Sequence, residues 1–270
     1  AIAVTLSIES TSDVTVPYTV SGTASGGSVD HDLADGALTI AAGTTFDSIA
    51  AAITDDALDE DDESIVVSMT TGSLVNATAG AFTTHTVTLT DDDSTPTVEF
   101  SSSAQTVAEG VGTVTFAAAL SAVSGRVVTV PYTVGGTASG SGIDHDLSAS
   151  TITIAAGDTT GSASFSVVND TLEEGDETVV VALDGASLVN ATEGGQNSHT
   201  ITITITDNDA PPVGTAQAVT TAEDTPVAIT LAGTDGDGDA LTYTVTTDPS
   251  NGTLSGTAPD VTYTPTGDYA

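Results

Sequence analysis

The stretch VTVPYTVSGTASG (Val14–Gly26) returns as VTVPYTVGGTASG at Val128–Gly140, which is 114 residues later. Three further segments recur at the same offset: DHDL, TIAAG and SLVNAT, which first begin at Asp30, Thr39 and Ser73. Solenoid units usually repeat every 20–50 residues or so, and a repeat of this length is therefore a whole domain. The chain carries two copies of one domain.

The second copy has the pattern of a series of short strands. TITITIT (Thr200–Thr206) alternates strictly, which indicates a sheet with one buried face, and Gly, Asp, Asn and Ser cluster between such runs. About seven short strands in roughly 115 residues are typical of an antiparallel β-sandwich. The predicted strands are Val98–Phe100 running on towards Val107, Thr113–Leu120, Val127–Val134, Thr151–Ile154, Ser162–Val168, Thr178–Leu183 and His199–Thr206.

Both ends of the chain are expected to be cut within a domain, so that the chain is a piece of a longer protein. Ala1 corresponds to Thr115, and the first copy therefore begins inside its second strand and would expose a sheet edge. A third unit follows the prolines at 211–212, which suit a stiff linker, and it is too short for a full sandwich. The expected domains are 1–94 without its first strand, 95–210 complete, and 211–270 partial.

Composition restricts the partners of the chain. It has 38 acidic residues, a single basic one (Arg126) and a formal net charge of −37. Nucleic acid is excluded as a partner, because phosphate binding needs Lys and Arg, and anionic membrane surfaces are disfavoured for the same reason. Cations are the natural partners. With no Cys, disulfides and thiolate metal sites are excluded as well.

Two acidic runs stand at equivalent places in the copies: DDALDEDDE (Asp55–Glu63) and NDTLEEGDE (Asn169–Glu177). A solvated acidic loop is the ordinary interpretation of such a run. However, two carboxylates ~5 Å apart repel by roughly 0.8 kcal/mol in water, and a domain is typically stable by only ~5–15 kcal/mol. Recurrence in register between core strands therefore favours a role for cations. Dense oxygen ligands suit Ca²⁺ better than Mg²⁺ or Zn²⁺.

The run NDTLEEGDET, with GTASG and DHD upstream and TDND downstream, resembles the Calx-β family. These domains occur in regulatory regions of sodium–calcium exchangers, in integrin β4 and in large bacterial surface proteins. The resemblance covers residues 1–93 in part and 95–209 in full. It implies a seven-stranded immunoglobulin-like sandwich with Ca²⁺ at one tip. The expected fold class is therefore all-β, with tandem immunoglobulin-like antiparallel β-sandwiches and with the first and last units truncated.

The resemblance also implies a set of Ca²⁺ ligands, carried over position by position. Asn169 and Asn208 stand where the family has carboxylates, and we expect fewer ions or weaker binding in the second site than in an intact first one. The counterpart of Glu109 in the first copy would precede residue 1. The implied ligands are Asp30, Asp55, Asp56, Glu60, Glu63, Asp91, Asp92 and Asp93 in the first copy, and Glu109, Asp144, Asn169, Asp170, Glu174, Glu177, Asp207 and Asp209 in the second.

The third unit resembles the cadherin-like or tandem repeats of bacterial surface proteins, through AEDTPVAITL, DGDGDALTY and YTP. DGDGDA also resembles the start of an EF-hand loop, but Ala240 and Thr246 replace that loop's Gly and bidentate Glu. Ca²⁺ binding by Asp235, Asp237 and Asp239 and a plain exposed turn both stay open.

Catalytic motifs are absent from the sequence. It has no nucleophile elbow and no phosphate-binding glycine loop. A pair of glycosidase carboxylates is not excluded by spacing, but metal binding explains the recurring acids better, and few aromatic residues are available to hold a sugar. The histidines are expected on surface strand edges rather than in zinc or catalytic sites; they are His31, His85, His145 and His199.

The predicted function is that of a non-enzymatic, calcium-binding structural segment of a large secreted or surface-anchored protein, in which Ca²⁺ rigidifies the domain chain for adhesion. The alternative is a Ca²⁺-sensing regulatory module attached to a membrane protein such as an exchanger. A third option is an accessory region of an extracellular hydrolase. The expected partners are calcium ions, neighbouring domains of the same chain, and a cell-surface or matrix ligand held by other domains.

Overall fold

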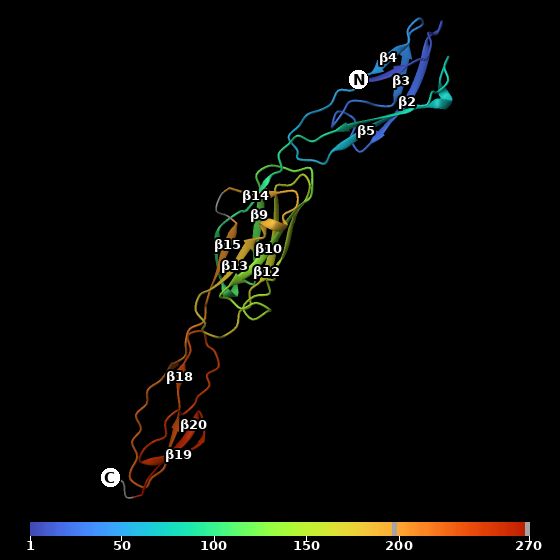
Figure 1. The fold of residues 1–270 in the computed structure, drawn as a ribbon. Helices are drawn as coiled ribbons and strands as arrows, with labels where there is room; N and C mark the ends of the chain where they lie inside the picture. Colours follow the sequence, from blue (N-terminus) through green and yellow to red (C-terminus); the bar gives the residue numbers. More distant parts are fainter. Residues whose placement is uncertain (196–198, 268–270) are drawn as a thin grey trace.

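The computed structural model describes residues 1–195 and 199–267. Residues 196–198 and 268–270, which fall in the expected second and third domains, lie outside the described part. Three units follow one another in line, with the unit that contains the N-terminus at one end and the C-terminal unit at the other (Figure 1). We call them the first repeat (β1–β6), the second repeat (β7–β15) and the C-terminal unit (β16–β20). Every described helix is a three-residue 3₁₀ turn, and none is long and apolar enough to cross a membrane.

The second repeat is built from two packed sheets. The five-stranded sheet has the order β11-β10-β13-β15-β8, and the four-stranded sheet has the order β12-β9-β7-β14. The strands are β7 (Thr97–Phe100), β8 (Ala104–Ala108), β9 (Thr113–Leu120), β10 (Val128–Gly136), β11 (Ser150–Ile154), β12 (Thr160–Ser166), β13 (Glu177–Leu183), β14 (Thr192–Glu193) and β15 (Thr200–Thr206).

The expected run from Val98 to Val107 is two strands in different sheets. β7 pairs antiparallel with β9, whereas β8 pairs parallel with β15, and the chain crosses between the sheets at residues 101–103. These three residues are serines, which have no apolar side chain to hold them in either sheet. The very short β14, which pairs parallel with β7, had no signal in the sequence pattern. The sandwich is otherwise antiparallel, as predicted.

The core of the second repeat lies between the two sheets. The strict alternation of β15 places Ile201, Ile203 and Ile205 inside, at exposures of 1%, 0% and 5%. The ring of Phe116 lies near its centre, 6.0 Å from the ring of Phe100 and 5.3 Å from that of Tyr132, in edge-to-face contacts. Such aromatic pairs add about 0.5–1.5 kcal/mol beyond the area they bury.

The first repeat has the strands of the second repeat except for counterparts of β7, β8 and the short β14. Its four-stranded sheet has the order β3-β2-β5-β6, and β1 pairs with β4. No strand among the described residues corresponds to β7 or β8. The strands are β1 (Ile2–Thr5), β2 (Val14–Gly22), β3 (Gly36–Ile40), β4 (Phe46–Ile49), β5 (Glu63–Met69) and β6 (Thr84–Leu89).

A glycine ends β2 and β10 for a steric reason. Gly22 and Gly136 have φ values of +131° and +123°, which side-chain-bearing residues rarely adopt. A Cβ atom at these positions would lie 2.0 Å from the carbonyl oxygen of Ser64 and 2.1 Å from that of Thr178. The conserved geometry of this strand end explains why the glycine recurs in both copies.

The C-terminal unit is thinner than the repeats. Its three-stranded sheet has the order β17-β20-β19, and β16 pairs with β18. Val261 is the one hydrophobic residue that is fully buried among the described residues of this unit. The strands are β16 (Val213–Gly214), β17 (Val227–Thr230), β18 (Gly233–Thr234), β19 (Gly252–Thr257) and β20 (Asp260–Pro265).

Tyr132 and Tyr18 occupy the same position in the two repeats, but Tyr132 is 5% exposed and Tyr18 is only partly buried. We expect Tyr132→Ala to destabilise the second repeat by about 3 kcal/mol, the cost typical of removing a buried aromatic side chain. Tyr18→Ala should cost the first repeat clearly less. Urea unfolding of each repeat checks the pair, and equal losses would contradict the difference in packing.

Candidate metal centres

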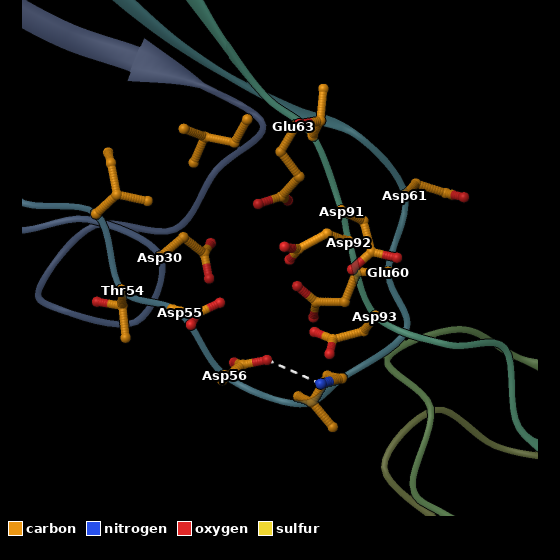
Figure 2. A pocket seen from close by; sticks show the side chains of 14 residues that line it. Asp30, Thr54, Asp55, Asp56, Glu60, Asp61, Glu63, Asp91, Asp92 and Asp93 are labelled. Atoms are coloured by element: carbon orange, nitrogen blue, oxygen red, sulfur yellow. Dashed lines mark hydrogen bonds between the residues drawn. The ribbon is translucent and has the colours of Figure 1, made fainter.

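Acidic loops gather at one end of each repeat. In the first repeat they follow β2, precede β5 and follow β6, so that segments far apart in sequence meet at the tip. Figure 2 shows the carboxylates of Asp30, Asp55, Glu60, Glu63 and Asp93 turned toward one common space. The space is a pocket of about 130 Å³, and all eight predicted ligands of the first repeat line it.

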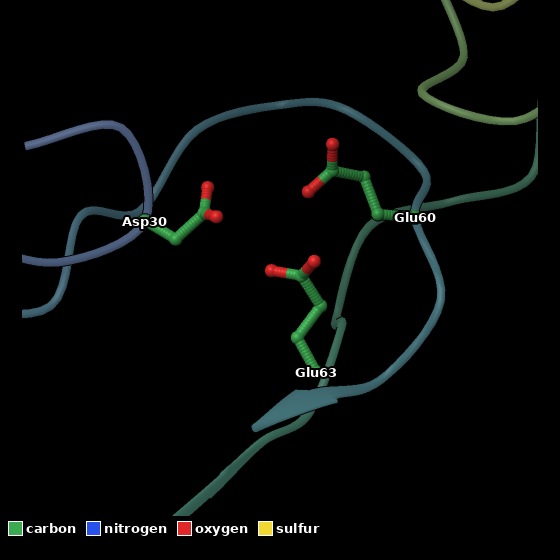
Figure 3. Close-up of side chains that lie close together, drawn as sticks. All are labelled: Asp30, Glu60 and Glu63. Carbon is green, nitrogen blue, oxygen red and sulfur yellow. The ribbon is translucent and has the colours of Figure 1, made fainter. Parts of the chain in front are cut away.

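Three of these carboxylates form a compact group. One oxygen each from Asp30, Glu60 and Glu63 lies within 4.8 Å of the others, and Figure 3 shows the three side chains converging from two loops and the start of β5. Glu63 is the first residue of β5, and the strand therefore anchors it. The Oδ2 atom of Asp30 accepts a hydrogen bond of 2.5 Å from the backbone N–H of Ser25, which orients that carboxylate.

The second repeat assembles the same group again. Asp144, Glu174 and Glu177 lie at the positions equivalent to Asp30, Glu60 and Glu63, and their oxygens are also within 4.8 Å of one another. Asp144 accepts a hydrogen bond from the backbone N–H of Ser139, as its counterpart does from Ser25. Two loops of different sequence therefore converge on one arrangement of carboxylates.

A further group in the second repeat consists of Glu109, Asp207 and Asp209, again within 4.8 Å. Glu109 opens the 3₁₀ turn η2 (Glu109–Val111) and is 9% exposed. The Oδ2 atom of Asp209 is buried without a hydrogen-bond partner. A buried carboxylate oxygen costs free energy unless something compensates it. A cation at this place would supply the missing partner, and the donor set therefore fits a hard metal ion such as Ca²⁺.

Short turns hold the acidic loops in shape. Asp56 and Asp170 each accept a hydrogen bond at Oδ1 from the backbone N–H two residues ahead, on Leu58 at 2.9 Å and Leu172 at 2.8 Å. The backbone N–H of Asp170 also donates to Oε1 of Glu109 at 3.1 Å, which ties the loop to η2. These bonds use one oxygen of each carboxylate and pre-organise the loops.

Burial and like charges raise the pKa of several tip carboxylates. For Glu177, burial first and then the neighbouring Asp144 raise the pKa to about 7. The pKa values of Glu109 and Asp209 are raised by burial and by nearby carboxylates. The pKa of Asp207 is lowered, because backbone N–H groups of residues 209, 175 and 174 donate to it. In the first repeat, burial and neighbouring acids likewise raise the pKa of Glu60, Glu63 and Asp93.

Some predicted ligands stay outside the compact groups. Asn169 lies beside η2. Its Oδ1 atom would be 3.1 Å from a Cβ atom added to Gly110, which is in that turn. The backbone N–H of Asp170 donates to Glu109, and Oδ1 of Asp170 accepts the turn bond from Leu172. Asp170 does not belong to the compact carboxylate groups found among the described residues.

The DGDGDA loop of the C-terminal unit closes on itself and touches the second repeat. Oδ1 of Asp235 accepts hydrogen bonds from the backbone N–H groups of residues 237, 238 and 239, which lower the pKa of Asp235. Oδ2 of Asp237 accepts one from the backbone N–H of Ala210 at 2.8 Å. Asp237 and Asp239 are among the charges that raise the pKa of Asp209. The loop therefore behaves as a turn at Asp235 and faces the second repeat's tip with its other two acids.

Sequence reasoning assigned no role to Arg126, which joins the two repeats. Its guanidinium binds Asp59 through two bonds, Nη2–Oδ1 at 2.5 Å and Nε–Oδ2 at 3.2 Å, and binds Asp61 at 3.1 Å. The hydroxyls of Ser124 and Thr95 and the backbone N–H of Gly125 also donate to Asp59. Asp59 is only 2% exposed. The acidic loop of the first repeat is therefore packed against the second repeat.

One signal in the sequence could have revealed this junction. Arg126 is the only Lys or Arg in the chain, and its counterpart in the first copy is Ser12. A single cation that breaks the repeat pattern suggests a role that only one copy has. Its partner was not predictable, because Asp59 is one of seven acids in its run.

The prediction for the histidines is wrong for two of them. His31 and His145 are each 3% exposed, and the Nδ1 atom of each accepts a hydrogen bond of 3.1 Å from the backbone N–H two residues ahead. Their rings pack in the core beneath the tip, and the ring of His145 lies 5.9 Å from that of Phe165. His85 and His199 do not occupy equivalent positions in the two repeats. His85 pairs with Val67, and the residue that pairs with the equivalent Val181 is Ile201.

Comparison with known families covers most of the chain. The family model described as the Calx-beta domain matches residues 1–93 and 91–209, and the model described as a bacterial Ig domain matches residues 208–270. The second match agrees with the immunoglobulin-like fold expected for the third unit, while its cadherin-like resemblance stays a prediction. No curated protein matches the chain.

Several solved structures are similar to the chain. The apo form of the Calx CBD1 domain is 20% identical, covers 43% of this chain and 100% of its own length, and has a TM-score of 0.39. The calcium binding domain CBD12 of CALX1.1 is 16% identical and covers 74% of this chain and 91% of its own, with a TM-score of 0.33. Domains 4–9 of the surface layer protein SbsC are 14% identical, cover 93% and 35%, and have a TM-score of 0.21.

The raised pKa of Glu177 predicts a pH dependence in the absence of divalent cations. The pKa is about 7 in the folded chain and 4.5 for an ordinary Glu, so between these values the folded chain holds a proton that the unfolded chain has lost. Stability of the second repeat should therefore fall as the pH rises through this window. Calorimetry in chelator at pH 5, 6, 7 and 8 measures the slope. Glu177→Gln should flatten it, and an unchanged slope would contradict the assignment.

Proposed function

Because the chain belongs to the Calx-beta domain family, we propose that its acidic tips bind Ca²⁺ and that the bound ions stiffen a chain of tandem domains. Calx-beta domains are calcium-binding domains. The observation that carries the proposal is the repeated carboxylate group, Asp30–Glu60–Glu63 and Asp144–Glu174–Glu177. A fold that crowds acids twice in the same arrangement needs a cation to offset their repulsion.

Each tip offers a set of hard oxygen ligands. Around its compact group the first repeat adds the acids at 55, 56, 91, 92 and 93, which line the same pocket. The second repeat adds the group of Glu109, Asp207 and Asp209, in which one buried oxygen is without a partner. Bound Ca²⁺ would supply positive charge and bridge the loops. The chain itself positions the carboxylates through strand starts and turn hydrogen bonds.

The tips lie at the junctions between the units, and this place supports a role in stiffening. Asp59, in the acidic run of the first repeat, is held by Arg126 of the second, and Ala210 after the second tip is bonded to Asp237 of the C-terminal unit. Ordering a tip loop would therefore also order the neighbouring unit. We propose that the linked units are three domains, which comprise residues 1–94, 95–210 and 211–270.

We place this segment in a large extracellular or cell-surface protein that acts in adhesion, without catalytic activity of its own. The match of residues 208–270 to a bacterial Ig domain supports this setting over a regulatory module of a membrane exchanger. Calcium ions and the neighbouring domains are the proposed partners. A cell-surface or matrix ligand would be held by other domains.

Calcium should raise the thermal midpoint of the second repeat. At a free Ca²⁺ concentration 100 times the Kd, binding adds about 2.7 kcal/mol to the free energy of unfolding, which shifts the midpoint of a domain of this size by roughly 10 °C. Glu174→Gln with Glu177→Gln should clearly reduce the shift, because it removes two carboxylates of one compact group and leaves the group of Glu109, Asp207 and Asp209. Asp158→Asn, an exposed acid in the turn before β12, is the matched control and should keep it. The same midpoint in Ca²⁺, Mg²⁺ and chelator would overturn the proposal.

The junction between the repeats should stiffen with Ca²⁺ and loosen without Arg126. Small-angle X-ray scattering of the full chain should give a longer maximum dimension in Ca²⁺ than in chelator. Arg126→Gln should broaden the distance distribution, since it removes the two-bonded pair with Asp59, while Arg126→Lys should be intermediate because it keeps the charge alone. Identical curves with and without chelator would rule out a stiffening role.

A further inference from the structure

The two repeats are joined by more than the ion pair of Arg126. Residues 124–126, with the sequence SGR, form a turn between β9 and β10, which we call the SGR turn. Ser124 lies beside Asp59 in a parallel β-bridge, and its hydroxyl donates to the carbonyl of Asp59 at 3.2 Å. The backbone N–H of Gly125 donates to the same carbonyl at 3.1 Å. The SGR turn therefore holds the backbone of the first repeat's acidic run in a fixed place.

The turn has the same shape in both repeats, but its side chains differ. The backbone N–H of its third residue donates to the hydroxyl oxygen of its first, from Arg126 to Ser124 at 3.1 Å and from Ser12 to Ser10 at 3.2 Å. The sequence of the turn is SGR in the second repeat and STS in the first. The shape of the turn therefore requires neither the glycine nor the arginine.

Gly125 leaves room for the side chain of Glu60. A Cβ atom added at position 125 would lie 2.6 Å from Cγ, 2.6 Å from Oε1 and 3.1 Å from Cδ of Glu60, and no atom beyond the neighbouring residues is nearer. Carbon atoms in contact prefer a separation of about 3.5–4.0 Å. The φ of Gly125 is not in the positive range, so alanine could adopt this backbone. A larger residue at position 125 would therefore displace Glu60 rather than distort the turn.

The acidic run of the second repeat is more exposed at the equivalent positions. Glu60 is half-buried, whereas its counterpart Glu174 is exposed. Leu58 is half-buried as well, whereas its counterpart Leu172 is 59% exposed. The C-terminal unit is bonded to the second repeat at the linker instead, through the backbone N–H of the residue before the two prolines. We attribute the burial of Glu60 to the SGR turn, which contacts it directly.

We propose that Gly125 is a positioning residue for the cation site of the first repeat. It lets the SGR turn pack behind Glu60 and so keeps that carboxylate turned toward Asp30 and Glu63, as Figure 3 shows it. This role rests on the proposed function, because Glu60 acts in it as a cation ligand. A ligand that is already held in place loses less side-chain entropy on binding. The second repeat thus raises the affinity of a site whose carboxylates all belong to the first.

Two backbone amides report on the two tips separately. The N–H of Ser25 donates to Asp30 in the first tip, and the N–H of Ser139 donates to Asp144 in the second. In NMR spectra of the isotope-labelled full chain, added Ca²⁺ should shift both amide signals. The dependence of each signal on the free Ca²⁺ concentration gives the apparent Kd of its own tip.

Gly125→Ala should weaken Ca²⁺ binding at the first tip about tenfold, because the added methyl group displaces Glu60. The Ser25 signal should then need about ten times more Ca²⁺, while the Ser139 signal is unchanged and shows that the second repeat is folded. Gly80→Ala is the matched control, since a Cβ atom added there meets nothing within 4 Å, and both signals should keep their Kd. An unchanged Kd at Ser25 in Gly125→Ala would overturn the proposal.

A double-mutant cycle separates the positioning of Glu60 from a general loosening of the junction. In a Glu60→Ala background the carboxylate is gone, and Gly125→Ala should then make no further change to the Kd at Ser25. A second loss of about tenfold in that background would mean that the glycine does not act through Glu60, and it would contradict the positioning role.

The same titrations distinguish this role from the proposed function. If neither amide of the unmodified chain responds to Ca²⁺, the proposed function fails, and the role of Gly125 fails with it. If both amides respond but Gly125→Ala binds Ca²⁺ as tightly as Gly80→Ala does, the tips are cation sites and only the role of Gly125 is overturned.

Discussion

Repulsion among carboxylates is the constraint on which the rest of this molecule depends. At each tip, carboxylate oxygens from separate segments of the chain lie within 4.8 Å of one another, and burial adds to their mutual repulsion in raising the pKa of Glu177. Specific backbone hydrogen bonds hold these carboxylates in place, for example the bond that the N–H of Ser25 donates to Asp30. Such an arrangement is stable at neutral pH only if protons or cations reduce the charge. The divalent ion that we propose would account for both the crowding and its repetition.

The guanidinium of Arg126 neutralises one of these carboxylates permanently. Arg126 neutralises Asp59, which is buried at the junction, and also binds Asp61 at the edge of the tip pocket, but it has no ion pair with the other described acids that line this pocket. An arginine cannot leave its site as an ion can. The contrast suggests two tasks for the acidic run: Asp59 docks the repeats, and Glu60 and Glu63 remain available for a cation. Adjacent positions of one loop thus connect metal binding with the geometry of the domain chain.

The internal repeat allows equivalent positions to be compared within one molecule. Equivalent positions such as Tyr18 and Tyr132 differ in burial, because no strand among the described residues of the first copy takes the places of β7 and β8. The same two strands lead directly to Glu109 at the tip of the second copy. In that copy, completion of the core and completion of the carboxylate cluster are therefore structurally one event.

The sequence by itself determined the repeat, the all-β class and most strands of the second repeat, because these follow from local alternation and from register between two copies. The resemblance to the Calx-β family implied Asp144, Glu174 and Glu177 as ligands, and the register relates them to Asp30, Glu60 and Glu63. Tertiary structure alone decided three other features: the change of sheet between β7 and β8, the burial of His31 and His145, and the choice of Asp59 as the partner of Arg126. Each depends on what packs against a residue from a distant part of the chain. Periodicity and composition report which side chains a segment has, but not which distant segment will cover them.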